Sequence, residues 1–163
     1  MQETLLQKPM IRAPEFARGE WLNTAYPLQM TTLRGRAVLV DFWEYSCINC
    51  LRTLPYLRQW HERYAHKGLT MVGVHSPEFP FGRERQQIEA AVRELEIEYP
   101  VLLDNQFKTW DAYANRFWPS KYLIDQHGYL RYQSHGEGGY GDFEQAIQAV
   151  LREIDPNVDL PPV

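Results

Sequence analysis

The chain lacks the features that mark several common classes of protein. Its 17 lysines and arginines are outnumbered by 21 aspartates and glutamates, and the formal net charge is -4. Because acids and bases are interleaved, the sequence offers neither a basic stripe for nucleic acid nor a polybasic patch for a membrane surface. No apolar run approaches membrane-spanning length. We therefore expect no nucleic-acid partner and no membrane contact.

The N-terminus also lacks the basic start and apolar core of a signal peptide. For the sequence as given we expect a cytoplasmic protein, and a periplasmic or extracytoplasmic one if an export signal has been removed. There is no internal repeat or low-complexity segment. The 163 residues, 44% of them hydrophobic and 13% aromatic, suit one globular domain. We expect a monomer.

Cysteine is scarce, since Cys47 and Cys50 are the only two. A structural disulfide usually joins distant segments, whereas this pair closes a loop too short to restrict the unfolded chain much. Zinc is an alternative, because His61 and His66 follow in an order similar to a zinc finger. However, apolar residues at helical spacing predict a helix here, which would place His61 about 16 Å from Cys50. We predict no metal site.

A pair of inert core cysteines is a third alternative, but the polar neighbours Ser46 and Asn49 do not suit a buried apolar position. The apolar run 38–42 predicts a buried strand followed by a helix, with Cys47 at the helix N-terminus. Unpaired amides and the helix dipole favour a thiolate there. Cys50 lies one turn further on, where it can resolve a mixed disulfide. The pattern predicts reversible two-electron thiol chemistry with no cofactor other than this disulfide.

The order of apolar runs and turn residues predicts an α/β fold with helices on both faces of a central mixed β-sheet. The expected strands are 37–42, 69–74, 100–103, 121–124 and 129–134, and the expected helices are 47–67, 83–95, 107–114 and 142–154, the last N-capped by Asp142. Segments 21–23 and 28–30 are expected to form an N-terminal hairpin. An extended segment 1–18 precedes a domain of residues 19–154, and a loose tail of residues 155–163 follows it. The crossover rule places the cysteines at the carboxyl end of a central strand.

Further motifs accompany the cysteine pair. They are Leu33-Arg34-Gly35, Asp41-Phe42-Trp43, the run from Tyr45 to Pro55, the run from Gly73 to Phe79 and the run from Trp118 to Asp125. Over residues 14–152 the chain resembles the thioredoxin superfamily, and within it the TlpA/ResA-like thiol-disulfide oxidoreductases. It is most similar to the thioredoxin-like domain of DipZ-type proteins. The resemblance implies a thioredoxin-like fold and thiol-disulfide exchange.

The resemblance implies roles for four catalytic residues. Cys47 corresponds to the exposed attacking thiolate and Cys50 to the buried resolving thiol. Asp41 falls where thioredoxins keep a buried acid that takes the proton of the resolving thiol, and a helix or turn cap is the alternative. Glu78 resembles the acid that TlpA-like proteins place near their cysteines, and an exposed loop carboxylate without a role is the alternative.

The resemblance also implies a substrate groove. Pro119 resembles the cis-proline that faces the cysteines in this superfamily and exposes the backbone of Trp118 to an extended substrate, whereas an ordinary trans turn proline is the alternative. Trp43 is expected in the groove or in the core. Ser46 and the pair Ile48-Asn49 are expected beside the substrate. They differ from the corresponding residues of thioredoxin itself, so the redox potential does not transfer.

The leading hypothesis is a thiol-disulfide oxidoreductase that acts on disulfides of proteins or small molecules and exchanges electrons with an unidentified thiol reductant. One alternative is a peroxidase of the peroxiredoxin or alkyl hydroperoxide reductase type. Val40 and Glu44 argue against it, because they replace the proline and threonine of the peroxidatic Pro-x-x-x-Thr-x-x-Cys pattern. The other alternative is a non-catalytic peptide-binding module that uses the Pro119 groove.

Overall fold

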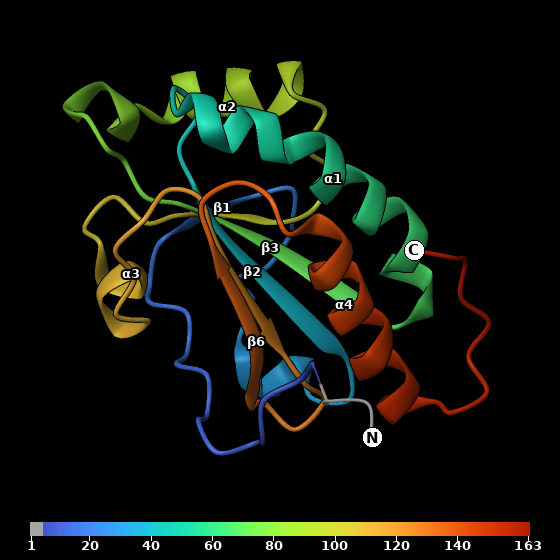
Figure 1. Cartoon of the computed structure of the whole chain (residues 1–163). Helices are drawn as coiled ribbons and strands as arrows, with labels where there is room; N and C mark the ends of the chain where they lie inside the picture. The colour runs from blue at the N-terminus through green and yellow to red at the C-terminus, as the bar shows by residue number, and fades with distance from the viewer. Residues whose placement is uncertain (1–4) are drawn as a thin grey trace.

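The structure is a computed structural model that describes residues 5–163, so the first four residues of the expected N-terminal segment lie outside it. Within these residues six strands form one sheet in the order β1-β4-β3-β2-β5-β6, accompanied by four α-helices (Figure 1). The strands are β1 Glu20–Leu22, β2 Ala37–Trp43, β3 Leu69–His75, β4 Val101–Leu103, β5 Ser120–Ile124 and β6 Leu130–His135. The helices are α1 Ile48–Tyr64, α2 Arg85–Glu94, α3 Lys108–Ala112 and α4 Tyr140–Ile154.

The predicted mixed sheet is confirmed, and β2 lies near its centre. Strand β2 runs parallel to β3 and antiparallel to β5, and all seven of its residues are buried. The parallel pairing continues from β3 to β4, whereas β5 to β6 is antiparallel. An almost wholly apolar strand suits this position, because both of its faces are covered.

The side chains of β2 alternate between two hydrophobic cores. Leu39 and Trp43 belong to the core under α1, α2 and α4, whereas Val40 and Phe42 belong to the core that α3 covers together with Phe16. Figure 1 shows α1 and α4 along one side of the sheet and α3 on the other. Helices therefore cover both faces, as predicted.

The helix that carries the cysteines begins at Ile48, directly after Cys47. It ends at Tyr64, and a short 3-10 turn leads to Gly68, whose φ of 117° is favourable only for glycine. The last helix differs from its prediction, because it begins at Tyr140 and its N-cap is Gly139. Asp142 lies in the first turn rather than at the cap, where its charge still faces the positive end of the helix dipole.

The predicted N-terminal hairpin is wrong. Strand β1 pairs with the edge of β4, about eighty residues away in sequence, and residues 30–33 form a 3-10 helix. Asn23 adopts a left-handed conformation (φ 61°) directly after β1, and its side-chain amide donates to the carbonyls of Ile97 and Tyr99 at 2.7 and 3.1 Å. These bonds turn the chain away from β1 and fasten it beside β4, so no return strand forms.

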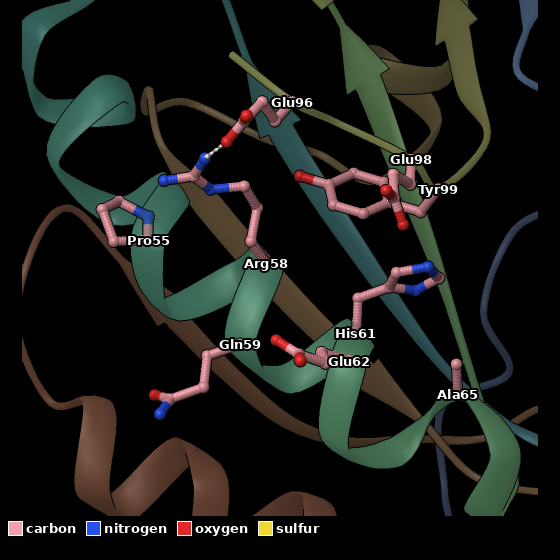
Figure 2. A pocket seen from close by; sticks show the side chains of 9 residues that line it. All are labelled: Pro55, Arg58, Gln59, His61, Glu62, Ala65, Glu96, Glu98 and Tyr99. Atoms are coloured by element: carbon pink, nitrogen blue, oxygen red, sulfur yellow. Dashed lines mark hydrogen bonds and ion pairs between the residues drawn. The ribbon is translucent and has the colours of Figure 1, made fainter.

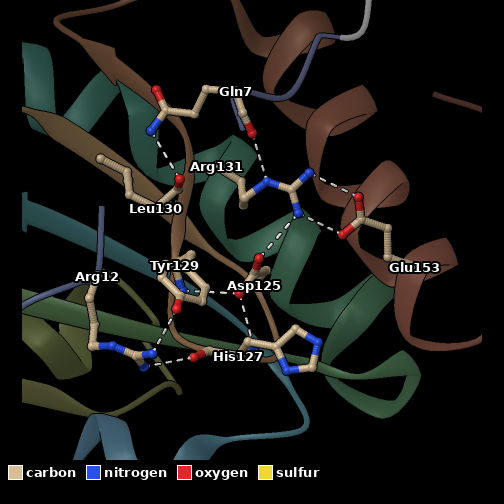
Figure 3. Close-up of polar contacts among 8 residues, drawn as sticks. All are labelled: Gln7, Arg12, Asp125, His127, Tyr129, Leu130, Arg131 and Glu153. Carbon is tan, nitrogen blue, oxygen red and sulfur yellow. Dashed lines mark hydrogen bonds and ion pairs between the residues drawn. The ribbon is translucent and has the colours of Figure 1, made fainter. Parts of the chain in front are cut away.

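The N-terminal segment is fastened to β6 by a polar network (Figure 3). The Gln7 amide donates to the Arg131 carbonyl at 2.8 Å, and its side chain donates to the Leu130 carbonyl at 2.9 Å. Arg131 in turn donates to the Gln7 carbonyl at 2.7 Å, to Asp125 at 3.1 Å and to both oxygens of Glu153 at 2.7 and 2.9 Å. Arg131 is only 8% exposed, and its charge-assisted bonds join the segment, β6 and α4.

The C-terminal tail also contacts the domain. The Gln148 side chain of α4 donates to the Pro161 carbonyl at 2.6 Å, and Val158 and Leu160 pack against the core under α1 and α4. The tail expected to be loose is therefore attached to α4 at these residues.

Candidate active site

The cysteine pair opens α1 directly after the central strand. Cys47 is the N-cap, with extended backbone (φ -77°, ψ 112°), and its Sγ accepts a hydrogen bond from the Cys50 amide at 3.2 Å. The helix terminus therefore offers an N–H group to this sulfur, as the sequence predicts. Cys47 is half-buried and Cys50 is 1% exposed, and both are free thiols. Only the first sulfur reaches solvent.

The two thiols have opposite pKa shifts. Hydrogen bonds from the Cys50 thiol and the Cys50 amide lower the pKa of Cys47 from 9.0 to about 7, against the opposing effects of partial burial and the charge of Glu78. Burial raises the pKa of Cys50, and the hydrogen bond to Cys47 and the charge of Asp41 raise it further. At neutral pH Cys47 therefore carries substantial thiolate, whereas Cys50 remains a thiol.

Two buried side chains hold the turn that presents Cys47. The Glu44 carboxylate is fully buried, and its Oε2 accepts from the amide of Ser46 at 3.0 Å and from the Ser46 hydroxyl. His75 Nε2 accepts from the Tyr45 amide at 3.1 Å. Burial lowers the pKa of His75 to about 3, so its ring is neutral and able to accept this bond. Sequence reasoning gave neither Glu44 nor His75 this positioning role.

Asp41 is buried within β2 on the face that α1 covers. It is 1% exposed, and its Oδ1 has no hydrogen-bonding partner in the described part of the chain. Burial raises the pKa of Asp41 from 3.8 to about 7, although the charge of Lys121 lowers it. Because Asp41 lies inside a strand, the cap alternative is wrong. The charge of Asp41 also raises the pKa of Cys50.

Lys121 is a residue of the site that sequence reasoning missed. It lies directly opposite Asp41 in the β2–β5 pairing and is 0% exposed. Burial lowers the pKa of Lys121, while the charges of Asp41 and Cys50 raise it. The signal in the sequence was a lysine at the start of the apolar run Tyr122-Leu123-Ile124. The sequence could not identify Asp41 as its partner, because it does not show which strand lies beside β2.

Exposed side chains surround the Cys47 sulfur. Glu78, on the loop after β3, is exposed, and its charge raises the pKa of Cys47. Ser46, Ile48 and Asn49 are exposed beside the cysteine, with Ile48 at 59%. All four are therefore accessible to a molecule that reaches Cys47.

The Trp118–Pro119 peptide bond is cis, in agreement with the resemblance. The next residue, Ser120, pairs with Phe42 of β2, so this bond lies at the strand end that leads to the cysteines. The half-buried Trp118 is fixed by its indole N–H, which donates to the Ser76 carbonyl at 2.8 Å. The proline and the cysteines therefore lie at the same edge of the sheet.

The structure contradicts a direct substrate contact for Trp43. Its side chain is 1% exposed and packs edge-on against His75, with ring centroids 4.9 Å apart. A Cβ at Gly73 would lie 3.0 Å from its Nε1 and 3.3 Å from Cε2 of Tyr99. The face alternation of β2 thus places Trp43 in the core, and Gly73 leaves room for two aromatic rings.

A cleft of about 920 Å³ lies away from the cysteines, between α1 and the chain that enters β4 (Figure 2). Arg58 and Glu96 form an ion pair at 3.0 Å at its rim, and His61 and Tyr99 also line it.

Across residues 5–163 no group of three His, Cys, Asp or Glu side chains is arranged to hold a metal ion. In the same residues no helix is both long and apolar enough to cross a membrane.

A free dithiol at the first turn of a helix, following a central strand of this mixed sheet, defines a thioredoxin-like protein. A thioredoxin-like superfamily protein of known crystal structure has the same fold, with a TM-score of 0.82, 24% identity and coverage of 93% of this chain and 100% of that one. The model of the AhpC/TSA family matches residues 11–133. The chain therefore belongs to the AhpC/TSA family.

Two relatives agree with the TlpA/ResA-like resemblance, which is confirmed. The chain is 43% identical over 143 residues to Protein DipZ of Mycobacterium tuberculosis. The matched region covers 86% of this chain and 21% of DipZ. It is 23% identical over 138 residues to the thiol-disulfide oxidoreductase ResA of Geobacillus thermodenitrificans. This matched region covers 85% of this chain and 75% of ResA. The chain thus spans about a fifth of the length of DipZ.

Proposed function

We propose that the protein is a thiol-disulfide oxidoreductase in which Cys47 attacks and Cys50 resolves. The observation that carries the proposal is the asymmetry of the pair, because one sulfur is accessible with a pKa of about 7 and the other is buried with a raised pKa. A nucleophile with a pKa near ambient pH combines a substantial thiolate fraction with good intrinsic reactivity. The name of the relative ResA supports the same activity.

The first step forms a mixed disulfide. The Cys47 thiolate attacks one sulfur of a substrate disulfide, a bond forms between them, and the other substrate sulfur leaves as a thiolate. The hydrogen bond from the Cys50 amide at 3.2 Å stabilises Cys47 both as the attacking and as the leaving sulfur. Exposed Ile48 and the backbone before the cis-proline Pro119 are proposed to contact the substrate.

The second step requires that Cys50 lose its proton. We assign this proton to the Asp41 carboxylate, which is ionised in part of the molecules at neutral pH because its pKa is about 7. The Cys50 thiolate then attacks the Cys47 sulfur, the protein disulfide forms, and the second substrate sulfur leaves as a thiolate. Asp41 releases the proton to solvent. Two electrons pass from the dithiol to the substrate, and the reverse sequence oxidises a substrate dithiol.

No cofactor other than this disulfide enters the proposal. The partners are a protein with a disulfide and a second thiol or disulfide that resets the cysteines, and the potential of the Cys47/Cys50 couple against that of its compartment decides the direction. Glu78 is proposed as a charge that tunes Cys47, since it raises the pKa of that thiol.

Reduction of insulin by dithiothreitol tests the proposal. The protein should accelerate insulin precipitation, and Cys47→Ser should abolish the acceleration. Cys50→Ser should instead trap a mixed disulfide through Cys47, visible by mass spectrometry. A wild-type protein without acceleration, or a Cys50→Ser variant that never captures a thiol, would overturn the assignment. Fast, saturating consumption of hydrogen peroxide by Cys47 would favour a peroxidase instead.

A further inference from the structure

The cleft in Figure 2 contains buried polar atoms that have no hydrogen-bonding partner. Tyr99 lines it and is 1% exposed, yet its hydroxyl has no partner in the described part of the chain. The same is true of Arg58 Nε and His61 Nδ1, two further buried atoms of lining residues. Leaving a buried polar atom unpaired costs free energy, so native proteins rarely do so. Three such atoms along one cleft therefore indicate a site that a ligand completes.

The charged side chains around these atoms make the cleft acidic. Glu62, Glu96 and Glu98 line it, against a single arginine. Arg58 pairs with Glu96 at 3.0 Å, whereas the exposed Glu62 and Glu98 form no ion pair within residues 5–163. Burial lowers the pKa of His61, although the charge of Glu98 raises it, so this ring adds no positive charge at neutral pH. Two carboxylates of the cleft are therefore left without a cation.

Hydrogen bonds within the chain fix both walls of the cleft. Arg58 of α1 donates to the Leu95 carbonyl at 3.3 Å, which ties the helix to the chain that enters β4. The Asn23 side chain holds the same chain segment through the carbonyls of Ile97 and Tyr99. The volume of about 920 Å³ lies at the upper end of the range of about 300–1,000 Å³ that is usual for ligand pockets. The site is therefore formed before a ligand arrives.

These groups together suit a basic peptide. An ammonium or guanidinium group can pair with Glu62 or Glu98. Arg58 Nε is only a donor, so it needs an acceptor such as a backbone carbonyl oxygen. Burial and the charge of Asp41 hold the pKa of Tyr99 well above its ordinary value, against the charge of Arg58, so its hydroxyl can donate or accept. A peptide with lysine or arginine supplies cations and carbonyls together, whereas a simple anion would meet the two unpaired carboxylates.

We propose that this cleft is a docking site for an extended basic segment of a partner protein. Glu62 and Glu98 bind the lysine or arginine side chains of the segment, and Arg58 and Tyr99 bind its backbone. Docking goes beyond the proposed function, because it needs no thiol chemistry. Since the cleft lies away from the cysteines, a docked segment leaves Cys47 accessible and raises the local concentration of the rest of the partner around the protein.

Titration of the reduced full chain, followed by NMR, tests the docking site. The probe is a short acetylated and amidated peptide in which lysine alternates with glycine, added at low ionic strength because salt screens exposed charges. The amide signals of residues 58–62 and 96–99 should shift until they saturate, while those of Ile48 and Asn49 beside Cys47 stay in place. The same peptide with glutamate in place of lysine is the control and should cause no saturable shift.

Three variants separate the contributions to binding. Glu62→Gln combined with Glu98→Gln removes both exposed charges and keeps the side-chain shapes, so the dissociation constant should rise about fivefold or more. Tyr99→Phe removes only the hydroxyl and should weaken binding about threefold or more. Its urea unfolding should show no loss of stability, since the hydroxyl has no partner in the free protein. Asp111→Asn, at an exposed position of α3 on the other face of the sheet, is the matched control and should bind like the wild type.

Several outcomes would overturn the proposal. They are the absence of a saturable shift, equal shifts outside the cleft, equal binding of the acidic peptide, and an unchanged affinity in the double glutamine variant or in Tyr99→Phe. If Tyr99→Phe does not fold, the double glutamine variant decides. Saturation of the cleft by spermidine with the affinity of the peptide would also overturn it, because the ligand would then be a small polyamine. Failure of the proposed function would look different, since a negative insulin assay leaves the titration unchanged.

Discussion

Asp41→Asn should stabilise the reduced protein at neutral and alkaline pH. The folded-state pKa of Asp41 is about 7, against an ordinary value of 3.8. As pH rises from 3.8, the unfolded chain loses this proton first, so the folded state loses stability until the pH passes about 7 and the penalty is complete. A difference of about 3 pH units at about 1.36 kcal/mol each corresponds to roughly 4 kcal/mol. Asparagine is neutral throughout and avoids this loss.

The assay is urea unfolding followed by circular dichroism, from about pH 4.5 to about pH 8, with both cysteines kept reduced. The gap in unfolding free energy between Asp41→Asn and the wild type should widen by roughly 3 kcal/mol over this range, because about 1 kcal/mol of the penalty is already present at about pH 4.5. Titrating groups that do not interact with Asp41 cancel because both proteins contain them. Asp159→Asn, at an exposed position in the tail, serves as the control and should stay within about 0.5 kcal/mol at every pH. A gap that does not widen would refute the raised pKa of Asp41.

Three further substitutions test separate parts of the site. Glu78→Gln removes a charge that raises the pKa of Cys47, so alkylation of this thiol near pH 6 should be faster than in the wild type, as measured by mass spectrometry. Glu44→Ala removes the carboxylate that accepts from the Ser46 amide and hydroxyl, and denaturant unfolding should show a loss of about 2 kcal/mol. Gly73→Ala places a methyl group 3.0 Å from a buried indole nitrogen, so its thermal unfolding should indicate a loss of about 1–3 kcal/mol.

Local sequence was enough for the elements that carry the cysteines. The apolar run 38–42 and the helical spacing after it predicted both β2 and α1, and Cys47 stands at the junction as the N-cap. These features depend on residues close together in the chain, where backbone preference and side-chain period act directly. The burial of Asp41 followed from the same run, because a residue inside a doubly covered strand is buried whatever its polarity.

Features that depend on distant pairing did not follow from the sequence. Strand β1 finds its partner in β4 rather than in a hairpin, because an open sheet edge and the Asn23 side chain determine where the chain turns. The place of Lys121 in the site could be recognised only from the strand register, which sets it opposite Asp41. The sequence did not show toward which face of the sheet the Trp43 side chain points. Both faces of β2 are covered, so its residues do not alternate between apolar and polar in a way that distinguishes the two faces.

Alkylation of the reduced wild-type protein, followed thiol by thiol from about pH 5 to about pH 9, tests the central claim most directly. Cys47 should react with a midpoint of about 7, and Cys50 should remain unmodified while the protein is folded. Equal and slow reaction of both thiols, or a Cys47 midpoint at the ordinary value of 9.0, would contradict the account.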